Sequence, residues 1–216
     1  MIELLFQGQV SLFIIILAAI IISLTFHEFG HAATAKLYGD DTAQKAGRLT
    51  LNPVAHIDPM GLLMVAIIGF GYAKPVPTNP QNFKSIWADM FVSAAGPGMN
   101  LLIAIVAINF YALGQVNGWS ITSGEGAQLF FVYLTLINLI LMIYNLIPIG
   151  ALDGHYILPY FLPRKMAQSY RYWNQRYGNH FMLALVVLSL LGVPIFSYIW
   201  TFGQSMLPLI TFVSSN

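Results

Sequence analysis

Thr25-Phe26-His27-Glu28-Phe29-Gly30-His31 lies inside an apolar segment that runs from Val10 to Leu37, and this segment decides the fold of the chain. Residues 10–24 hold no charged side chain, and at about 1.5 Å of rise per residue they reach about two-thirds of the way across a ~30 Å hydrocarbon layer. Ionisable groups at that depth are costly to keep and therefore indicate function. On a helix, His27 and His31 share one face, where two imidazole nitrogens can bind one ion, and Glu28 projects from nearly the same side. The alternative is that both histidines are packed and hydrogen-bonded to backbone, which leaves Glu28 without a role.

The composition is that of an integral membrane protein. Of 216 residues, 57% are hydrophobic and 8% are charged, whereas about 25% are charged in an average soluble domain. A net charge of +1, without a basic cluster, gives no electrostatic basis for binding nucleic acid. Because the chain has no cysteine, disulfides and thiolate metal sites are excluded, and histidines and carboxylates must hold any metal. No Lys or Arg precedes the first apolar run, so we expect this helix to be retained and not cleaved as a signal peptide.

Hydropathy predicts an all-α, polytopic helical bundle with about four to six membrane segments. Between the first and second long spans we expect a small β-hairpin, an extended stretch or a re-entrant segment. All of residues 1–216 are predicted to form one membrane-embedded domain. Its predicted parts are a first span at 10–37, a β or re-entrant region at 38–87, spans at 88–113 and 127–154, a cytoplasmic loop at 155–179, and a terminal kinked helix or hairpin at 180–213.

The region after the first span combines a strand-like pattern with a short apolar run. Residues 48–51 alternate as a strand does, and Asn52-Pro53 ends the pattern. The apolar run at 62–70 is too short to span and predicts a re-entrant segment. Lys74-Pro75-Val76-Pro77 can only be extended or an edge strand, which could bind an unwound substrate segment as an added strand. The alternative is a solvated connector.

Two further spans carry polar or helix-breaking residues. Small residues such as Gly96 and Gly98 allow close helix contact, and Pro97 is expected to bend the helix. Asn100 is expected to hydrogen-bond to freed backbone or to a neighbouring helix. The third long span ends in Asn145, and Pro148 with two glycines predicts unwinding up to Gly154. Unwound backbone at membrane depth must line a cavity or be buried in protein.

The distribution of positive charge predicts the orientation. All Lys and Arg residues fall within 36–84 and 164–176. The positive-inside rule then places the amino terminus and the loop at 114–126 outside, and the regions 38–88 and 155–179 on the cytoplasmic side. His31 and Asp153 therefore approach the same, cytoplasmic, side of the membrane.

A catalytic zinc ion typically has three protein ligands and a water, so a third ligand is needed beside the histidine pair. Asp153 is favoured, because an ionised carboxylate in an otherwise apolar region requires a strong partner. A turn or cap role for Asp153 is the alternative. The other candidates are Asp58, His56, His155 and Asp89. His56 and Asp58 are expected in a polar loop where no partner is demanded. His155, next to Asp153, is expected either to support a metal ligand or to be structural.

The combination of two motifs resembles the site-2 protease family of intramembrane zinc metalloproteases. H-E-x-x-H lies in the first of several membrane helices, and N-x-x-P-x-x-x-x-D-G follows at Asn145, Pro148, Asp153 and Gly154. Further stretches, at 47–53, 55–59, 73–77 and 95–97, resemble the compact prokaryotic branch, so matching motifs extend from about residue 26 to residue 155. The chain departs from the pattern at Gly150, where many members have proline, and at His155, where glycine often follows.

The resemblance implies that His27, His31 and Asp153 bind one Zn²⁺ ion and that Glu28 is the general base. Asn145, by the same resemblance, binds the substrate backbone or the developing oxyanion, although tying helix to helix is an alternative. The implied activity is hydrolysis of peptide bonds in or near transmembrane segments of membrane-anchored proteins. The implied location is the plasma membrane, with several membrane passes, lipid around the chain and the active site toward the cytoplasm.

Three other functions use similar residues. A metal or ion transporter predicts paired polar interruptions in two related halves, and the sequence contains no repeat. A di-iron oxygenase or desaturase needs several histidine clusters, and five histidines with one H-x-x-x-H pair are too few. An inactive binding scaffold is opposed by the intact ligand set.

Overall fold

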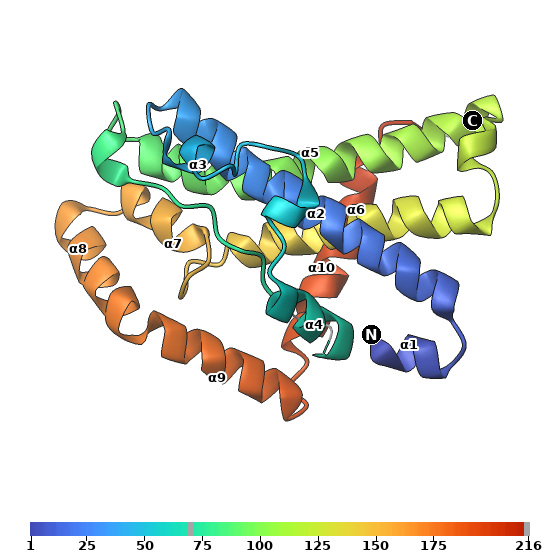
Figure 1. Ribbon diagram of the computed structural model, residues 1–216. Helices are drawn as coiled ribbons and strands as arrows, with labels where there is room; N and C mark the ends of the chain where they lie inside the picture. The colour runs from blue at the N-terminus through green and yellow to red at the C-terminus, as the bar shows by residue number, and fades with distance from the viewer. Residues whose placement is uncertain (69–70, 214–216) are drawn as a thin grey trace.

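Three long helices make up the body of the protein. The computed structural model describes residues 1–68 and 71–213, and Figure 1 shows α2 (Val10–Leu37), α5 (Ala88–Asn117) and α6 (Glu125–Asn145) side by side. Each is long and apolar enough to cross a membrane. Within the described residues no other helix reaches that length, and a helix of five residues, α1 (Ile2–Phe6), precedes α2. The chain is therefore an all-helical integral membrane protein with three candidate spans.

Small residues allow the long helices to approach closely. Ala19, Ala104 and Ala107 are buried among them, next to Leu134 and Leu139. Without a hydrophobic force between helices in lipid, close van der Waals packing at small side chains is what holds such a bundle together.

No β-hairpin forms between α2 and α5 in the part of the chain that the structure describes, so this option of the prediction is wrong. The region instead holds α3 (Thr42–Lys45), η1 (Pro53–Ala55), α4 (Pro59–Ile68) and η2 (Pro80–Asn82). An isolated antiparallel bridge joins Ile57 to Ala73. The chain bends at 49–50, where the Thr50 carbonyl lies 2.8 Å from His56 Nε2, and Asn52 then caps η1 by accepting from the N–H of Val54. Local side-chain contacts thus replace the strand partner that residues 48–51 would need.

The short apolar run at 62–70 is helical as far as residue 68. It belongs to α4, which has ten residues and is too short to span. Residues 69 and 70 of the predicted re-entrant segment lie outside the described residues. The chain that follows, at 71–79, has no regular secondary structure apart from the bridge at Ala73, and its backbone is extended at Asn79.

The unwinding predicted after the third span is confirmed. Helix α6 ends at Asn145, and residues 146–153 form turns in which Gly150 has φ 66°. Asn174 holds this turn from the far side: its Oδ1 accepts from Gly150 N at 2.8 Å, and its Nδ2 donates to Gly150 O at 2.9 Å. The segment predicted as a loop at 155–179 is largely helical, with α7 (Gly154–Ile157), η4 (Leu158–Phe161), α8 (Arg164–Trp173) and the π-helical turn η5 (Asn174–Gly178).

The terminal apolar stretch forms two helices, which resolves the alternative left open by the sequence. Helix α9 (Asn179–Leu190) and helix α10 (Ile195–Ile210) are separated by a turn with Gly192 at φ 97°. Helix α10 packs against α5 and α6 through Met206, Leu207 and Ile210, whereas α9 lies apart from the three long helices in Figure 1.

Candidate metal centre

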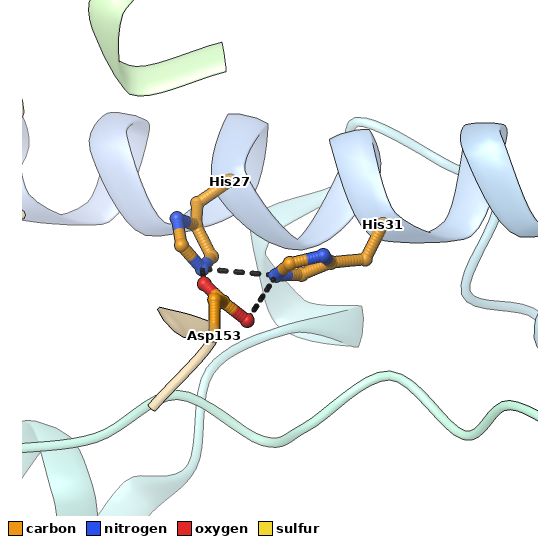
Figure 2. Close-up of side chains that lie close together, drawn as sticks. All are labelled: His27, His31 and Asp153. Carbon is orange, nitrogen blue, oxygen red and sulfur yellow. Dashed lines mark hydrogen bonds and ion pairs between the residues drawn. The ribbon is translucent and has the colours of Figure 1, made fainter. Parts of the chain in front are cut away.

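Two histidines of α2 and one aspartate from the turn after α6 meet at one point. The ligand atoms of His27, His31 and Asp153 all lie within 4.8 Å of one another. Figure 2 shows the three side chains pointing toward one another. His27 Nε2 is 3.0 Å from His31 Nε2 and 3.3 Å from Asp153 Oδ2, and His31 Nε2 is 3.4 Å from Asp153 Oδ1. Their side chains are 7%, 12% and 16% exposed, respectively. The helical spacing of four brings the two imidazoles together, and the turn at 146–153 places the Asp153 carboxylate beside them.

Gly154 is the residue that allows the turn to close. A Cβ at this position would lie 2.8 Å from the carbonyl carbon of Ile147 and would overlap the Leu146 backbone. Only glycine permits the start of α7 to pass so near the end of α6. The position of Asp153 therefore depends on its neighbour having no side chain.

Helix α5 supports both imidazoles from the other side. His31 Nδ1 lies 2.7 Å from the carbonyl oxygen of Val92, and His27 Nδ1 lies 2.6 Å from Asn100 Oδ1. Between these two contacts, a Cβ on Gly96 would lie 2.6 Å from His27 Cε1 and would overlap the His31 ring. Positions 92, 96 and 100 are four apart and share one helix face. The sequence prediction did not include this supporting face of α5. The spacing of four between Gly96 and Asn100, equal to that between His27 and His31, was a usable signal.

The donor set fits a zinc ion. The Val92 carbonyl only accepts hydrogen bonds, so His31 Nδ1 carries the proton in the neutral ring and Nε2 presents a lone pair. Asp153 Oδ2 is buried without a hydrogen-bond partner. The Nε2 atoms of His27 and His31 and the Asp153 carboxylate thus bring lone pairs together with no hydrogen-bond donor between them. A cation stabilises such an arrangement. Two histidine nitrogens and one carboxylate oxygen are also the ligand set of one class of catalytic zinc site.

Glu28 lies on the same helix, beside the predicted substrate segment. It is 7% exposed, and its Oε2 accepts a hydrogen bond from the backbone N–H of Val76 at 3.1 Å. The extended residues Lys74-Pro75-Val76-Pro77 thus lie next to the carboxylate. Because the two prolines have no N–H, Lys74 and Val76 supply the only N–H groups of this tetrapeptide, and the N–H of Lys74 donates to His56 O at 2.8 Å.

Arg48 fixes the same segment from the other side and was not predicted as a functional residue. Its side chain is buried, 4% exposed, and donates to the carbonyls of Lys74 and Pro75, the latter at 3.0 Å. His56 is fully buried and its Nδ1 lies 3.5 Å from Arg48 Nη2. The expectation that His56 needs no partner in a polar loop is therefore wrong: burial forces its ring nitrogens to be paired.

Asp40 anchors the far end of the extended segment to the end of α2. Its carboxylate is fully buried and accepts four hydrogen bonds, from the N–H and hydroxyl of Thr42, the N–H of Asn79 and the side-chain amide of Asn82. Burial raises the pKa of Asp40, but these hydrogen bonds outweigh burial and lower the pKa to about 2. The anchor is therefore ionised at neutral pH.

The remaining candidates lie apart from the metal ligands or have other roles. Asn145 donates to Leu141 O in its own helix at 2.9 Å. Asp58 caps α4 by accepting from the N–H groups of its first turn, each at 2.9 Å. His155 Nδ1 is buried without a hydrogen-bond partner, and Asp89 lines a different cavity.

Comparison with known proteins is consistent with this geometry. The profile of peptidase family M50 matches residues 15–123 and 116–189. Two relatives are named "Putative zinc metalloprotease". YwhC of Bacillus subtilis is 37% identical over 196 residues, covering 88% of this chain and 85% of YwhC. Rip2 of Mycolicibacterium smegmatis is 31% identical over 157 residues, covering 68% of this chain and 57% of Rip2. No solved structure gives a significant match.

Proposed function

This chain belongs to peptidase family M50, the site-2 protease family of zinc metalloproteases, and from that premise we propose that it is an intramembrane endopeptidase. Its proposed substrates are membrane-anchored proteins, cut in or near their transmembrane segments. The observation that carries the proposal is the convergence of His27, His31 and Asp153 beside Glu28. We assign the metal to the first three residues, one Zn²⁺ per chain, and the general base to Glu28.

Glu28 moves the proton in the proposed reaction. Zinc, when bound, supplies a Lewis acid for the scissile carbonyl and lowers the pKa of water to about 7. Since the hydrogen bond from Val76 occupies Oε2 of Glu28, we assign proton transfer to Oε1. Glu28 takes a proton from the attacking water as the water oxygen bonds to the carbonyl carbon of the substrate. It then gives that proton to the leaving amine as the C–N bond breaks.

Asn145 and the extended segment are the proposed substrate contacts. Asn145 lies at the end of α6, and release of its amide from Leu141 O would free a donor for the substrate carbonyl. Loss of such a donor costs roughly 3 kcal/mol of transition-state stabilisation. We propose that Lys74, Pro75, Val76 and Pro77 bind the unwound substrate as an added strand; their position next to Glu28 supports this role. The N–H groups of this segment and the carbonyls of Lys74 and Pro75 already have partners in the protein, so the proposed pairing uses the carbonyls of Val76 and Pro77. The substrate helix must unwind first, because a helix engages its own carbonyls.

We propose that residues 1–216 form one protease domain in the plasma membrane, with about four to six membrane segments once the shorter helices are included. The proposed orientation puts the metal site toward the cytoplasm. In Figure 1 the end of α2 that bears His31 lies at the same end of the bundle as α3, α7 and α8. Helices α3 and α8 carry Lys45, Arg164, Lys165 and Arg171, which the positive-inside rule assigns to the cytoplasm.

The test is Glu28→Gln in the purified protein, reconstituted with a single-span reporter. The amide is close in size to the carboxylate but cannot take the proton, so zinc content should stay at one per chain while cleavage is lost. Glu125→Gln is the matched control, since Glu125 is exposed in the first turn of α6, at the opposite end of the bundle. Cleavage by Glu28→Gln at the rate of the unmodified protein would refute the assignment.

A further inference from the structure

A polar cluster lies where α2, α5 and α6 meet. Ser23, Asn100 and Asn138, one from each helix, are all fully buried. Two carboxamides inside a membrane bundle are costly unless their donors and acceptors are paired. The pairing is extensive, and it ends at a nitrogen of His27.

The orientation of the Asn138 amide is fixed by backbone. One of its side-chain atoms lies 2.7 Å from the Leu134 carbonyl, which only accepts hydrogen bonds, so this atom must be the nitrogen. The same nitrogen lies 2.7 Å from Ser23 Oγ, which is free to accept because its own proton goes to the Ala19 carbonyl at 2.6 Å. Asn138 Oδ1 therefore points toward α5.

Asn138 in turn fixes the orientation of Asn100. The Asn100 atom 2.8 Å from Asn138 Oδ1 must be its nitrogen, and the carbonyl of Ser23, 3.3 Å away, requires the same assignment. Asn100 Oδ1 is then the atom 2.6 Å from His27 Nδ1. Because an amide oxygen only accepts, Nδ1 carries the proton in the neutral ring. Nε2 is left with the lone pair that faces Asp153.

We propose that Asn100 is a positioning residue that holds His27 in its metal-binding tautomer, with Asn138 and Ser23 locking its orientation. The inference rests on the proposed metal site and adds to it the group that prepares one ligand. A histidine whose second nitrogen donates to a fixed acceptor has both its tautomer and its ring orientation set. His31 is held by the backbone carbonyl of Val92, which no side-chain replacement removes. His27 is thus the histidine ligand whose tautomer and ring orientation depend on other side chains.

The competing role for Asn100 is simple attachment of one helix to another. Asn109 is a suitable control, because it lies on the same helix and donates to Ile210 O of α10 at 2.6 Å, away from the metal ligands. Loss of helix attachment lowers thermal stability in both variants. Loss of the fixed His27 tautomer weakens zinc binding only in the variant at position 100.

The experiment compares Asn100→Leu, Asn100→Asp and Asn109→Leu in detergent micelles. The first readout is zinc affinity, by competition with a chromophoric chelator. We expect it to fall about 10- to 100-fold in Asn100→Leu, to stay within a few-fold in Asn100→Asp, which keeps an oxygen acceptor, and to be unchanged in Asn109→Leu. Unchanged affinity in Asn100→Leu would overturn the proposal.

The second readout is ¹⁵N NMR of histidine-labelled, metal-free protein, with His27→Gln used for assignment. In the unmodified chain we expect neutral His27 to carry its proton on Nδ1, and in Asn100→Leu to sample both tautomers. A proton on Nε2 in the unmodified chain would overturn the proposal even if no variant folds. Both readouts are independent of cleavage, so an inactive protein that binds zinc would refute the proposed protease and leave this inference standing.

Discussion

Replacing Gly96 by alanine adds one methyl group between the two imidazoles and tests whether α5 sets the ligand geometry. The new Cβ would lie 2.6 Å from His27 Cε1 and would overlap the His31 ring. Ordinary van der Waals contact begins at 3.4 Å, so the His27 ring, or the helix, must move by about 1 Å. Such overpacking typically costs about 1–3 kcal/mol. Misplacement of a reacting group by about 1 Å can cost on the order of 100-fold in rate.

Gly98 provides the matched control on the same helix. A Cβ there meets nothing within 4 Å, so Gly98→Ala should be neutral or more stable by up to about 1 kcal/mol, from helix propensity alone. We expect Gly96→Ala to bind zinc at least 10-fold more weakly and to lose reporter cleavage by about 100-fold. Zinc competition and reporter cleavage, both per folded protein, give the measurement. If the two alanine variants bind zinc equally well, the reasoning that α5 positions the imidazoles is wrong.

Three further predictions concern Asp40, Arg48 and the metal ion. The Asp40 carboxylate has a folded pKa of about 2, below the ordinary 3.8, so its stabilisation is complete above about pH 4 and is lost as the pH falls toward 2. Asp40→Asn should lower the thermal midpoint at pH 7, and this difference should shrink below pH 4; a constant difference would contradict the assignment. Arg48→Met removes the hydrogen bonds to the Lys74 and Pro75 carbonyls and should raise the KM for the reporter about 10-fold at unchanged zinc affinity. Lys45→Met, at an exposed position of α3, is its control, and an equal KM in both variants would exclude this role for Arg48. Chelation should abolish cleavage and added zinc should restore it; cleavage that persists in metal-free protein would refute the metal mechanism.

Local rules were sufficient where one segment decides its own structure. The helix expected at 10–37 is α2 with the same limits, because the apolar run has no internal proline and the chain turns at Gly39, where φ is 100°. The unwinding before Gly154 likewise follows from Pro148 and Gly150, whose backbone preferences are local. That His27 and His31 lie on one face of α2 follows from the helical period alone.

Local rules failed where the partner lies elsewhere in the chain. The alternation at 48–51 predicts a strand, but a strand needs a neighbour, and Arg48 instead turns its side chain to the carbonyls of a distant segment. His56 belongs to a polar stretch of sequence, yet it is fully buried beneath that segment. Burial is a property of the assembled fold, so the composition around a residue did not predict it.

By itself the sequence determined the first long helix and the histidine pair on it, and by resemblance the family, because period, length and motif spacing are read along one chain. Only the tertiary structure decided that Asp153 reaches the pair and that Asn100 faces His27 with its oxygen. That last orientation is set by the carbonyl of Leu134 on a third helix, acting through Asn138. These hydrogen bonds form only when α2, α5 and α6 are packed together. The tautomer of His27, the proposed zinc ligand, therefore depends on the whole bundle.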